Sequence, residues 1–279
     1  MNTPTTLYLD RPGGRLSYDD NGVDGPLVIA APGMGDLRHV YRHIRDDVAQ
    51  AGIRLVAMDL RGMGDSSTGW AQLDDAAVAS DYLALIDHLD VGAAVLVGNS
   101  LSCASAVLAA TDAPDKVNAI MLLGPFVRDV PQKWWQKAAF GAMLMPPWGK
   151  GAWVSYYRKN MYPGAKPPDF DGYVDALSQN LSESGRFASF RTISGSSHAE
   201  SGRRLDQVTQ PTVVVMGTAD PDFPDPVAEA NQIAEIMNAT VVWSEGSGHY
   251  PQAETPTLVA NELIGLVDRV TGTWSPPQS

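Results

Sequence analysis

The stretch AAVLVGNSLSCASAVLAA, residues 93–110, decides the fold of this chain. An apolar run typical of a buried strand leads directly into Gly98-Asn99-Ser100-Leu101-Ser102, and a helix-forming run follows at once. A strand that turns this sharply into a helix strains the backbone at the turn, so the residues two positions before and after it must be small. Gly98 and Ser102 meet that requirement. The stretch therefore predicts a nucleophile elbow with Ser100 at its tip.

Outside this stretch, short apolar runs alternate with longer segments of helical period. This is the pattern of an α/β protein with a mostly parallel sheet and helices on both faces. The expected strands are Arg15–Tyr18, Leu27–Ala31, Leu55–Met58, Ala94–Val97, Ala119–Leu123, Thr212–Met216 and Thr240–Trp243. The expected helices are Val40–Ala51, Asp75–Leu89, Leu101–Ala113, Pro226–Met237 and Thr257–Val270. A chain of 279 residues can bury such a core without disulfides, and its single cysteine, Cys103, excludes an internal one.

The alternation stops after Leu123, and the next expected strand begins at Thr212. Residues 125–207 hold 13 of the 22 aromatic residues. We therefore expect a core domain made of residues 1–124 and 208–279, with an inserted helical cap or lid made of residues 125–207. Disorder is expected only at the tail, Ser275 to Ser279.

Composition argues against several kinds of partner. The 32 Asp and Glu outnumber the 20 Lys and Arg and give a formal charge of −12, opposite to the basic surface that nucleic acid requires. The N-terminal residues have no apolar signal-peptide core, and no apolar run approaches the ~18 residues of a membrane span. We expect a cytoplasmic protein without a membrane span that acts on a small hydrophobic molecule. The oligomeric state is not predicted.

A serine hydroxyl is a weak nucleophile until a base takes its proton, so the elbow requires a histidine and a carboxylate that orients it. His249 follows the strand Thr240–Trp243 in a Gly-Ser-Gly loop. It thus lies beyond the carboxyl end of a strand, where α/β sheets bind their ligands. The other histidines are expected to be ordinary solvated side chains: His39, His43, His88 and His198.

The orienting carboxylate is expected after the preceding strand. Asp220 comes just beyond the run VVVMG, which gives the chain order Ser100, Asp220, His249. Asp222 and Asp225 are close enough to compete for this role. Asp129 is a more distant alternative.

Two backbone N–H groups are expected to hold the negative oxygen that forms during acyl transfer. Leu101 supplies one at the start of the helix, and Met34 supplies the other from the loop Pro32-Gly33-Met34-Gly35-Asp36, whose glycines allow close approach. The same loop lacks the Lys-Ser/Thr of a P-loop and the spacing of a dinucleotide fingerprint, so no cofactor is expected. No metal is expected either, since one cysteine cannot form a thiolate cluster.

A further cluster, DLRGMGDS, occupies residues 59–66 after the strand Leu55–Met58. Its glycines and alternating charges indicate a structural loop. We expect Arg61 to pair with Asp59 or Asp65 and assign the cluster no catalytic role.

In order and context, PGMGD, DLRGMGDSS, GNSLS, GTADPDFP and GSGHYPQAE resemble the motifs of the α/β-hydrolase superfamily, in its serine-nucleophile branch with a helical cap. The resemblance covers nearly the whole chain outside residues 125–207. It implies an eight-stranded core sheet with Ser100 as nucleophile, His249 as base and Asp220 as orienting acid. Three positions depart from the common pattern. Pro32 stands where many members have histidine, Ser102 replaces a glycine, and Tyr250 follows the histidine where aromatic residues are common but not uniform; none of these removes a required chemical group.

The identity of the nucleophile selects among branches of this superfamily. Members that resemble haloalkane dehalogenases or epoxide hydrolases use an aspartate at the elbow, so Ser100 argues against both. The leading hypothesis is a serine hydrolase that cleaves a carboxylic ester, lactone or thioester of a hydrophobic small molecule through an acyl-enzyme on Ser100.

Two alternatives remain at this point. The Gly-Asn-Ser elbow is similar to that of carbon–carbon bond hydrolases that act on ring-fission keto-enol acids. Arg158, Arg186 or Arg191 would then bind the substrate carboxylate, and the sequence favours none of the three. The G-x-S-x-S form also resembles plant hormone receptors of the superfamily, which predicts a ligand-binding sensor with vestigial hydrolysis.

Overall fold

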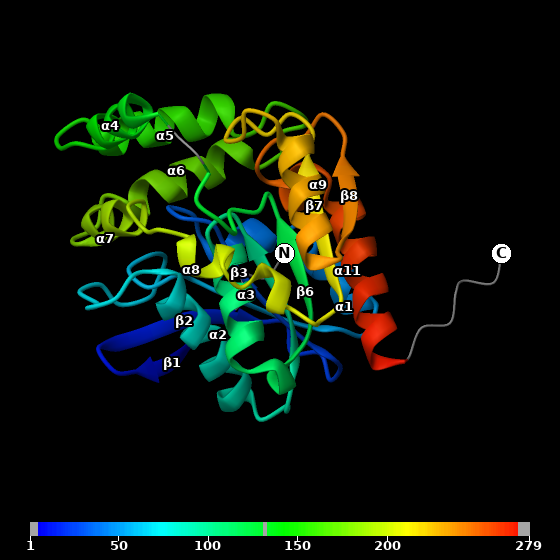
Figure 1. The fold of residues 1–279 in the computed structure, drawn as a ribbon. Coiled ribbons are helices and arrows are strands. Elements are labelled where there is room, and N and C mark those ends of the chain that lie inside the picture. The colour runs from blue at the N-terminus through cyan, green and yellow to red at the C-terminus, as the bar shows by residue number, and fades with distance from the viewer. Residues whose placement is uncertain (1–4, 131–132, 273–279) are drawn as a thin grey trace.

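The computed structural model describes residues 5–130 and 133–272 (Figure 1). Its centre is a sheet of eight strands in the order β1-β2-β4-β3-β5-β6-β7-β8. The strands are β1 (Leu7–Arg11), β2 (Gly14–Asp20), β3 (Leu27–Ala31), β4 (Arg54–Met58), β5 (Ala94–Asn99), β6 (Val117–Leu123), β7 (Thr212–Gly217) and β8 (Thr240–Ser244). β2 pairs antiparallel with both β1 and β4, and every other pair is parallel. The predicted α/β-hydrolase fold with a mostly parallel sheet is confirmed.

The central strands are buried because helices cover both faces of the sheet. β3, β5 and β7 are buried along their whole length, as their continuous apolar runs predict. On one face α1 (Arg45–Gln50) packs against α11 (Pro256–Thr271), and on the other α2 (Asp75–Leu89) packs against α3 (Ser102–Asp112) (Figure 1). α9 (Pro226–Met237) packs against β7 and β8. The described helices include none long and apolar enough to cross a membrane.

Local signals account for the start of two helices. The expected helices Asp75–Leu89 and Pro226–Met237 coincide with α2 and α9, whose N-caps are Asp74 and Asp225. Each cap side chain accepts a hydrogen bond from a backbone N–H of the first turn, which satisfies one of the free donors there. The predicted disorder of residues 275–279 lies outside the described residues.

Two elements differ from the sequence prediction. β1 is not predicted, because its residues LYLDR alternate between apolar and polar and lie half exposed at the sheet edge. The helix expected over residues 40–51 is divided into a short 3₁₀ helix, η1 (Arg38–Tyr41), and α1.

Between β6 and β7 the described residues form helices joined by turns and loops, with no strand. In Figure 1 the helices within residues 134–193 form a layer over one end of the sheet, whereas the short helix at residues 199–202 lies beside α3. The helices of this segment are α4 (Trp134–Met143), α5 (Gly149–Asn160), α6 (Phe170–Asn180), α7 (Arg186–Ile193), α8 (Ala199–Gly202) and the 3₁₀ helix η3 (Leu205–Gln207). Their aromatic side chains divide into two groups. Trp153, Tyr157 and Phe190 are buried, whereas Trp134 is 82% exposed.

The ion pairs of the loop at residues 59–66 differ from the predicted ones. Arg61 pairs with Asp81 of α2 at 2.7 Å, and its guanidinium lies over the ring of Trp70. Asp59 and Asp65 pair instead with Arg38. The predicted pairing within the loop is wrong because each charge finds a partner that is distant in sequence.

Replacing Gly98 by alanine should destabilise the fold. A Cβ at Gly98 would lie 2.5 Å from the Ser102 carbonyl oxygen and 2.7 Å from the Cys103 nitrogen, and relieving these clashes would displace α3 from β5. We expect Gly98→Ala to lower the free energy of unfolding by about 2 kcal/mol or more, measured in urea. Gly265→Ala, in α11, is the matched control: its Cβ would meet only Arg269 Nη1 at 3.7 Å. Equal stability of the two variants would contradict this account of the turn.

Candidate active site

Ser100 occupies the turn between β5 and α3. Its φ of +58° lies in the left-handed region, which costs energy for a residue with a Cβ. The Ser100 N–H donates to the Leu123 carbonyl at 2.9 Å, which ties the turn to the end of β6. The Ser102 hydroxyl donates to the Pro32 carbonyl at 2.5 Å. Serine in place of glycine at position 102 therefore joins the turn to the loop that contains Met34.

The loop at residues 32–36 lies directly against Ser100. A Cβ on Gly33 would lie 3.0 Å from the Ser100 Cβ, so the backbone approaches as closely as a glycine permits. Within the described chain, the N–H groups of Met34 and Leu101 have no hydrogen-bond acceptor. Both predicted donors are therefore available to an oxygen of a ligand.

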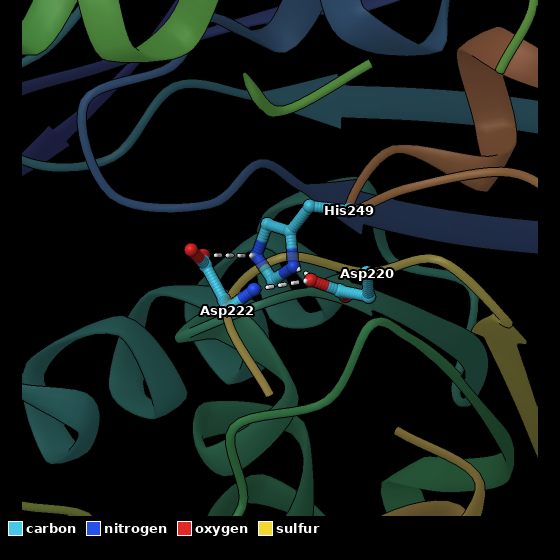
Figure 2. Close-up of side chains that lie close together, drawn as sticks. All are labelled: Asp220, Asp222 and His249. Carbon is cyan, nitrogen blue, oxygen red and sulfur yellow. Dashed lines mark hydrogen bonds and ion pairs between the residues drawn. The ribbon is translucent and has the colours of Figure 1, made fainter. Parts of the chain in front are cut away.

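His249 and Asp220 form a buried pair beyond the ends of β8 and β7 (Figure 2). His249 Nδ1 lies 2.7 Å from Asp220 Oδ2, and the two side chains are 1% and 0% exposed. The other Asp220 oxygen, Oδ1, accepts the N–H of Asp222 at 3.0 Å. Because both oxygens are engaged, the carboxylate holds the imidazole in one orientation.

The side chain of Asn99, next to Ser100, fixes the loop that carries His249, which we call the histidine loop. Asn99 Nδ2 donates to the His249 carbonyl at 3.1 Å and to the Leu123 carbonyl at 3.0 Å. Gly124, with a φ of +52°, passes so close that a Cβ would lie 3.1 Å from His249 Nδ1. Asn99 is a site residue that the sequence analysis missed. Its only signal is its place within the elbow motif.

The second nitrogen of the imidazole faces a different carboxylate. His249 Nε2 lies 3.7 Å from Asp222 Oδ2, and no hydrogen bond joins Nε2 to the Ser100 hydroxyl among the described residues. Asp222, considered as a competitor of Asp220, thus lies on the opposite side of the ring. The structure brings Asp220 and His249 into contact, and Asn99, which precedes Ser100, bonds the backbone carbonyl of His249.

Burial and charge act in opposite directions on the histidine. Burial alone would lower the pKa of His249, but the negative charges of Asp220 and Asp222 outweigh it and raise the pKa to about 9. Burial, together with repulsion by Asp220, raises the pKa of Asp222, against the opposing effects of His249 and the Tyr156 hydroxyl. The imidazole is therefore held in its charged form at neutral pH.

Asp36 anchors the glycine loop to the helices above it. This fully buried carboxylate accepts the hydroxyl of Tyr173 at 2.5 Å, that of Tyr157 at 3.0 Å and the Leu37 N–H at 2.8 Å. Burial raises the pKa of Asp36, against these hydrogen bonds. The tyrosines belong to α5 and α6, so one side chain couples the loop beside Ser100 to two helices of the β6–β7 segment. The sequence offers no signal for this pairing.

The other candidate carboxylates have different partners. Asp225 caps α9 by accepting the Ala228 N–H. Asp129 accepts the Ser197 hydroxyl and the His198 N–H, each at 2.7 Å. Neither is the carboxylate on His249 Nδ1, which is Asp220.

His198 differs from the expected solvated side chain. Its Nδ1 lies 2.8 Å from Asp75 Oδ2, and only 13% of the side chain is exposed. The expectation of a solvated histidine is wrong here because residues 197–199 fold back onto the start of α2.

Two arginines considered for binding a substrate carboxylate are already paired. Arg158 bonds Asp171 and Asp175 on the surface of α6. Arg186 donates to the carbonyls of Met63 and Ser66. Among the described residues, neither arginine forms an ion pair or hydrogen bond with His249, Asp220 or Asp222.

Asp220, Asp222 and His249 also constitute a group of potential metal ligands. Their ligand atoms lie within 4.8 Å of one another. However, His249 Nδ1 is already hydrogen-bonded to Asp220 Oδ2 at 2.7 Å, and a metal ion bound there would have to break this bond. The donor set thus fits an orienting acid–histidine pair better than a metal centre.

Comparison with known proteins identifies the family. Residues 28–262 match the model of the alpha/beta hydrolase family, so the chain belongs to this family. An esterase from Thermogutta terrifontis has a similar structure, with a TM-score of 0.74 and 21% identity over 96% of this chain and 99% of that one. At this level of identity, the likeness shows the fold.

Two curated relatives match a shorter region. An epoxide hydrolase from Caballeronia sordidicola is 33% identical over 135 residues, which is 42% of this chain. A 2-hydroxy-6-oxononadienedioate/2-hydroxy-6-oxononatrienedioate hydrolase from Burkholderia vietnamiensis is 30% identical over 115 residues, 39% of this chain. Either match spans only 40% of the relative's own length.

The positions of the two carboxylates predict different effects of their neutral variants. Asp220→Asn removes the charge that orients His249 Nδ1, and we expect kcat for ester hydrolysis to fall by roughly 10³–10⁴-fold. Asp222→Asn should cost far less, because it leaves the Nδ1 partner intact. Steady-state kinetics on a 4-nitrophenyl ester measure both, and the reverse ranking would make Asp222 the orienting acid.

The charged imidazole predicts an alkaline pH profile. A histidine acts as a base only when it is neutral, and the pKa of His249 is raised to about 9, so kcat/KM should still be rising between pH 7 and 9. Asp222→Asn removes one of the charges that raise this pKa, and its profile should reach its plateau at lower pH. Superimposable pH profiles of the two proteins would show that Asp222 does not act on His249.

Proposed function

We propose that this protein is a serine hydrolase that cleaves a carboxylic ester, lactone or thioester of a hydrophobic small molecule through an acyl-enzyme on Ser100. The observation that carries the proposal is the strained turn at Ser100, in front of α3 and tied by Asn99 to the buried His249–Asp220 pair. A backbone held at positive φ by its surroundings is a recurrent feature of functional sites. Membership of the alpha/beta hydrolase family supports it.

The first half of the reaction forms the acyl-enzyme. The Ser100 oxygen attacks the substrate carbonyl carbon while neutral His249 Nε2 takes the hydroxyl proton. The carbonyl oxygen becomes negative and binds to the N–H groups of Leu101 and Met34, where the start of α3 adds favourable dipole charge. His249 then gives the proton to the departing oxygen or sulfur. The bond between the carbonyl carbon and the leaving group breaks, and Ser100 carries the acyl group.

The second half repeats these steps with water. His249 takes a proton from a water molecule, whose oxygen attacks the acyl carbon. The bond to Ser100 breaks, its oxygen recovers the proton from His249, and the carboxylic acid leaves. Asp220 stabilises the imidazolium that forms in each half, without itself taking a proton.

The helices between β6 and β7 are proposed to act as the cap of this site. Phe190 and Trp153 lie against Gly35: a Cβ there would come within 2.6 Å of the Phe190 ring and 3.0 Å of Trp153 Nε1. Buried aromatic side chains in contact with the loop beside Ser100 supply an apolar environment for the substrate. This supports a hydrophobic substrate.

Carbon–carbon bond hydrolysis is the second candidate, favoured by the Burkholderia vietnamiensis relative. Its substrate is an acid and requires a cationic partner. Arg158 and Arg186 are engaged elsewhere, the third candidate, Arg191, lies exposed on α7, and a carboxylate, that of Asp222, lies at His249. These contacts favour ester chemistry. Turnover of 4-nitrophenyl acetate without turnover of a dienol acid would separate the two reactions.

Replacing the serine tests the proposal directly. Ser100→Ala should reduce kcat for 4-nitrophenyl butanoate by roughly 10³-fold or more, because no hydroxyl remains at the tip of the turn and that of Ser102 is bonded to the Pro32 carbonyl. The melting temperature should change little, since alanine keeps the Cβ and the backbone. Ser184→Ala, at an exposed position in the turn between α6 and α7, is the control and should retain full activity. Undiminished turnover by Ser100→Ala would refute the assignment. A single slow turnover by the native protein, ending in a lasting adduct, would indicate a sensor instead.

A further inference from the structure

The carboxylate of Asp222 lies beside the nitrogen that exchanges protons in the proposed reaction. Asp222 Oδ2 is 3.7 Å from His249 Nε2, and 17% of its side chain is exposed. Asp220 already holds the opposite nitrogen at 2.7 Å, so Asp222 is not required to orient the ring. Figure 2 shows the imidazole between the two carboxylates. Asp222 is therefore a charge on the side of the ring where a leaving group must depart.

Two hydrogen bonds fix the position of this charge. The Asp222 N–H donates to Asp220 Oδ1 at 3.0 Å, and its own Oδ1 accepts the Tyr156 hydroxyl from α5 at 2.7 Å. Among the described residues, His249 is the one cation that pairs with Asp222. That pairing is transient in the proposed reaction, because the imidazolium becomes neutral when it protonates the departing oxygen. The carboxylate then lacks a countercharge of the protein's own.

The surroundings of His249 strengthen the effect of this charge. Phe126 and Phe223 stack on each other with ring centres 4.5 Å apart, and they lie 5.8 and 6.4 Å from the His249 ring. Apolar walls lower the local dielectric constant, so a charge acts more strongly than it would in water. Aromatic faces also attract cations and repel anions.

We propose that Asp222 sets the charge specificity of the site for the leaving group: esters of neutral or cationic alcohols are cleaved, and esters of anionic alcohols are rejected. The proposal rests on the proposed serine hydrolase function and names the substrate class for it. His249 Nε2 must come within about 3 Å of the departing oxygen, so that oxygen lies within about 7 Å of the Asp222 carboxylate. The charge of a para-substituted phenol lies several Å beyond that oxygen, and unit charges about 10 Å apart, at an effective dielectric constant of about 20, correspond to roughly 15-fold in rate.

Three butanoate esters of matched phenols test this directly. The leaving groups are 4-hydroxybenzoate, its neutral methyl ester and (4-hydroxyphenyl)trimethylammonium, which carry charges of −1, 0 and +1. All three esters form the same butanoyl-enzyme on Ser100. Differences in kcat/KM therefore arise before or during release of the phenol. For each protein, kcat/KM of the charged ester is divided by kcat/KM of the neutral ester, which cancels the fraction of active protein. Comparing this ratio between variants then cancels the intrinsic reactivity of each ester.

In the native protein at pH 8, we expect the anionic ester to be the poorest substrate. Asp222→Asn should raise the ratio of anionic to neutral kcat/KM by roughly 10-fold and lower the ratio of cationic to neutral. Asp222→Ser, a second uncharged variant, should shift both ratios in the same directions. Asp222→Glu keeps the charge and should keep the native ratios even where its absolute rates fall.

Tyr156→Phe separates charge from packing. It removes the hydrogen bond to Asp222 but leaves the carboxylate in place, so both ratios should stay within about twofold of native. Ratios unchanged in Asp222→Asn and Asp222→Ser would overturn the proposal, as would loss of all turnover in both. A shift in Tyr156→Phe as large as in Asp222→Asn would also overturn it. Undiminished turnover of the neutral ester by Ser100→Ala would instead refute the proposed function. The ratios measured for the Asp222 variants test only the charge specificity, so the two failures can be told apart.

Discussion

The close approach of β5 to α3 is the constraint on which the rest of this structure depends. The backbone reverses within one residue, Ser100, and the reversal is possible only because Gly98 presents no Cβ to the carbonyl of Ser102. The reversal aligns three features at one point: a side chain at the tip of the turn, the free N–H groups at the start of a helix, and the edge of the sheet where neighbouring strands end. The energy stored at one positive φ is offset by the buried contacts of β5 and α3 on either side.

The surrounding loops are positioned by polar side chains rather than by strands. Ser102 holds the glycine loop through Pro32, Asn99 holds the histidine loop through a carbonyl, and Asp36 holds two tyrosines of the overlying helices. Each is buried, where an unpaired polar group would be costly, so each contact is strongly specified. The proposed site is thus preorganised by hydrogen bonds between segments far apart in the sequence. In the proposed mechanism such rigidity keeps the donors aimed at the developing negative oxygen.

Sequence alone predicts the parts of this arrangement that depend on local chemistry. The elbow at Ser100, the buried strands and the helix boundaries at Asp74 and Asp225 all follow from short-range patterns. The contact between Asp220 and His249 also follows, because both come just after neighbouring parallel strands. The catalytic roles of these residues, and the cap role of the β6–β7 helices, stay predictions.

Contacts between residues far apart in the sequence could not be predicted from the sequence. Arg61 bonds Asp81 rather than a neighbour in its own loop, and His198 bonds Asp75 although a polar loop surrounds it. The position of Asp222 at His249 Nε2 has the same origin: only Pro221 separates it from Asp220, yet the turn between them sends the two carboxylates to opposite sides of one ring. The spacing of charged residues in the sequence does not predict this arrangement of the two carboxylates.

The most direct test of the central claim is chemical labelling of the native protein with a fluorophosphonate, followed by peptide mass spectrometry. A serine activated by His249 displaces fluoride and keeps the phosphonyl group, so the account predicts a single adduct, on Ser100, that fails to form when His249 is replaced by alanine. An adduct on another residue, or equal labelling of Ser100 without the histidine, would contradict it.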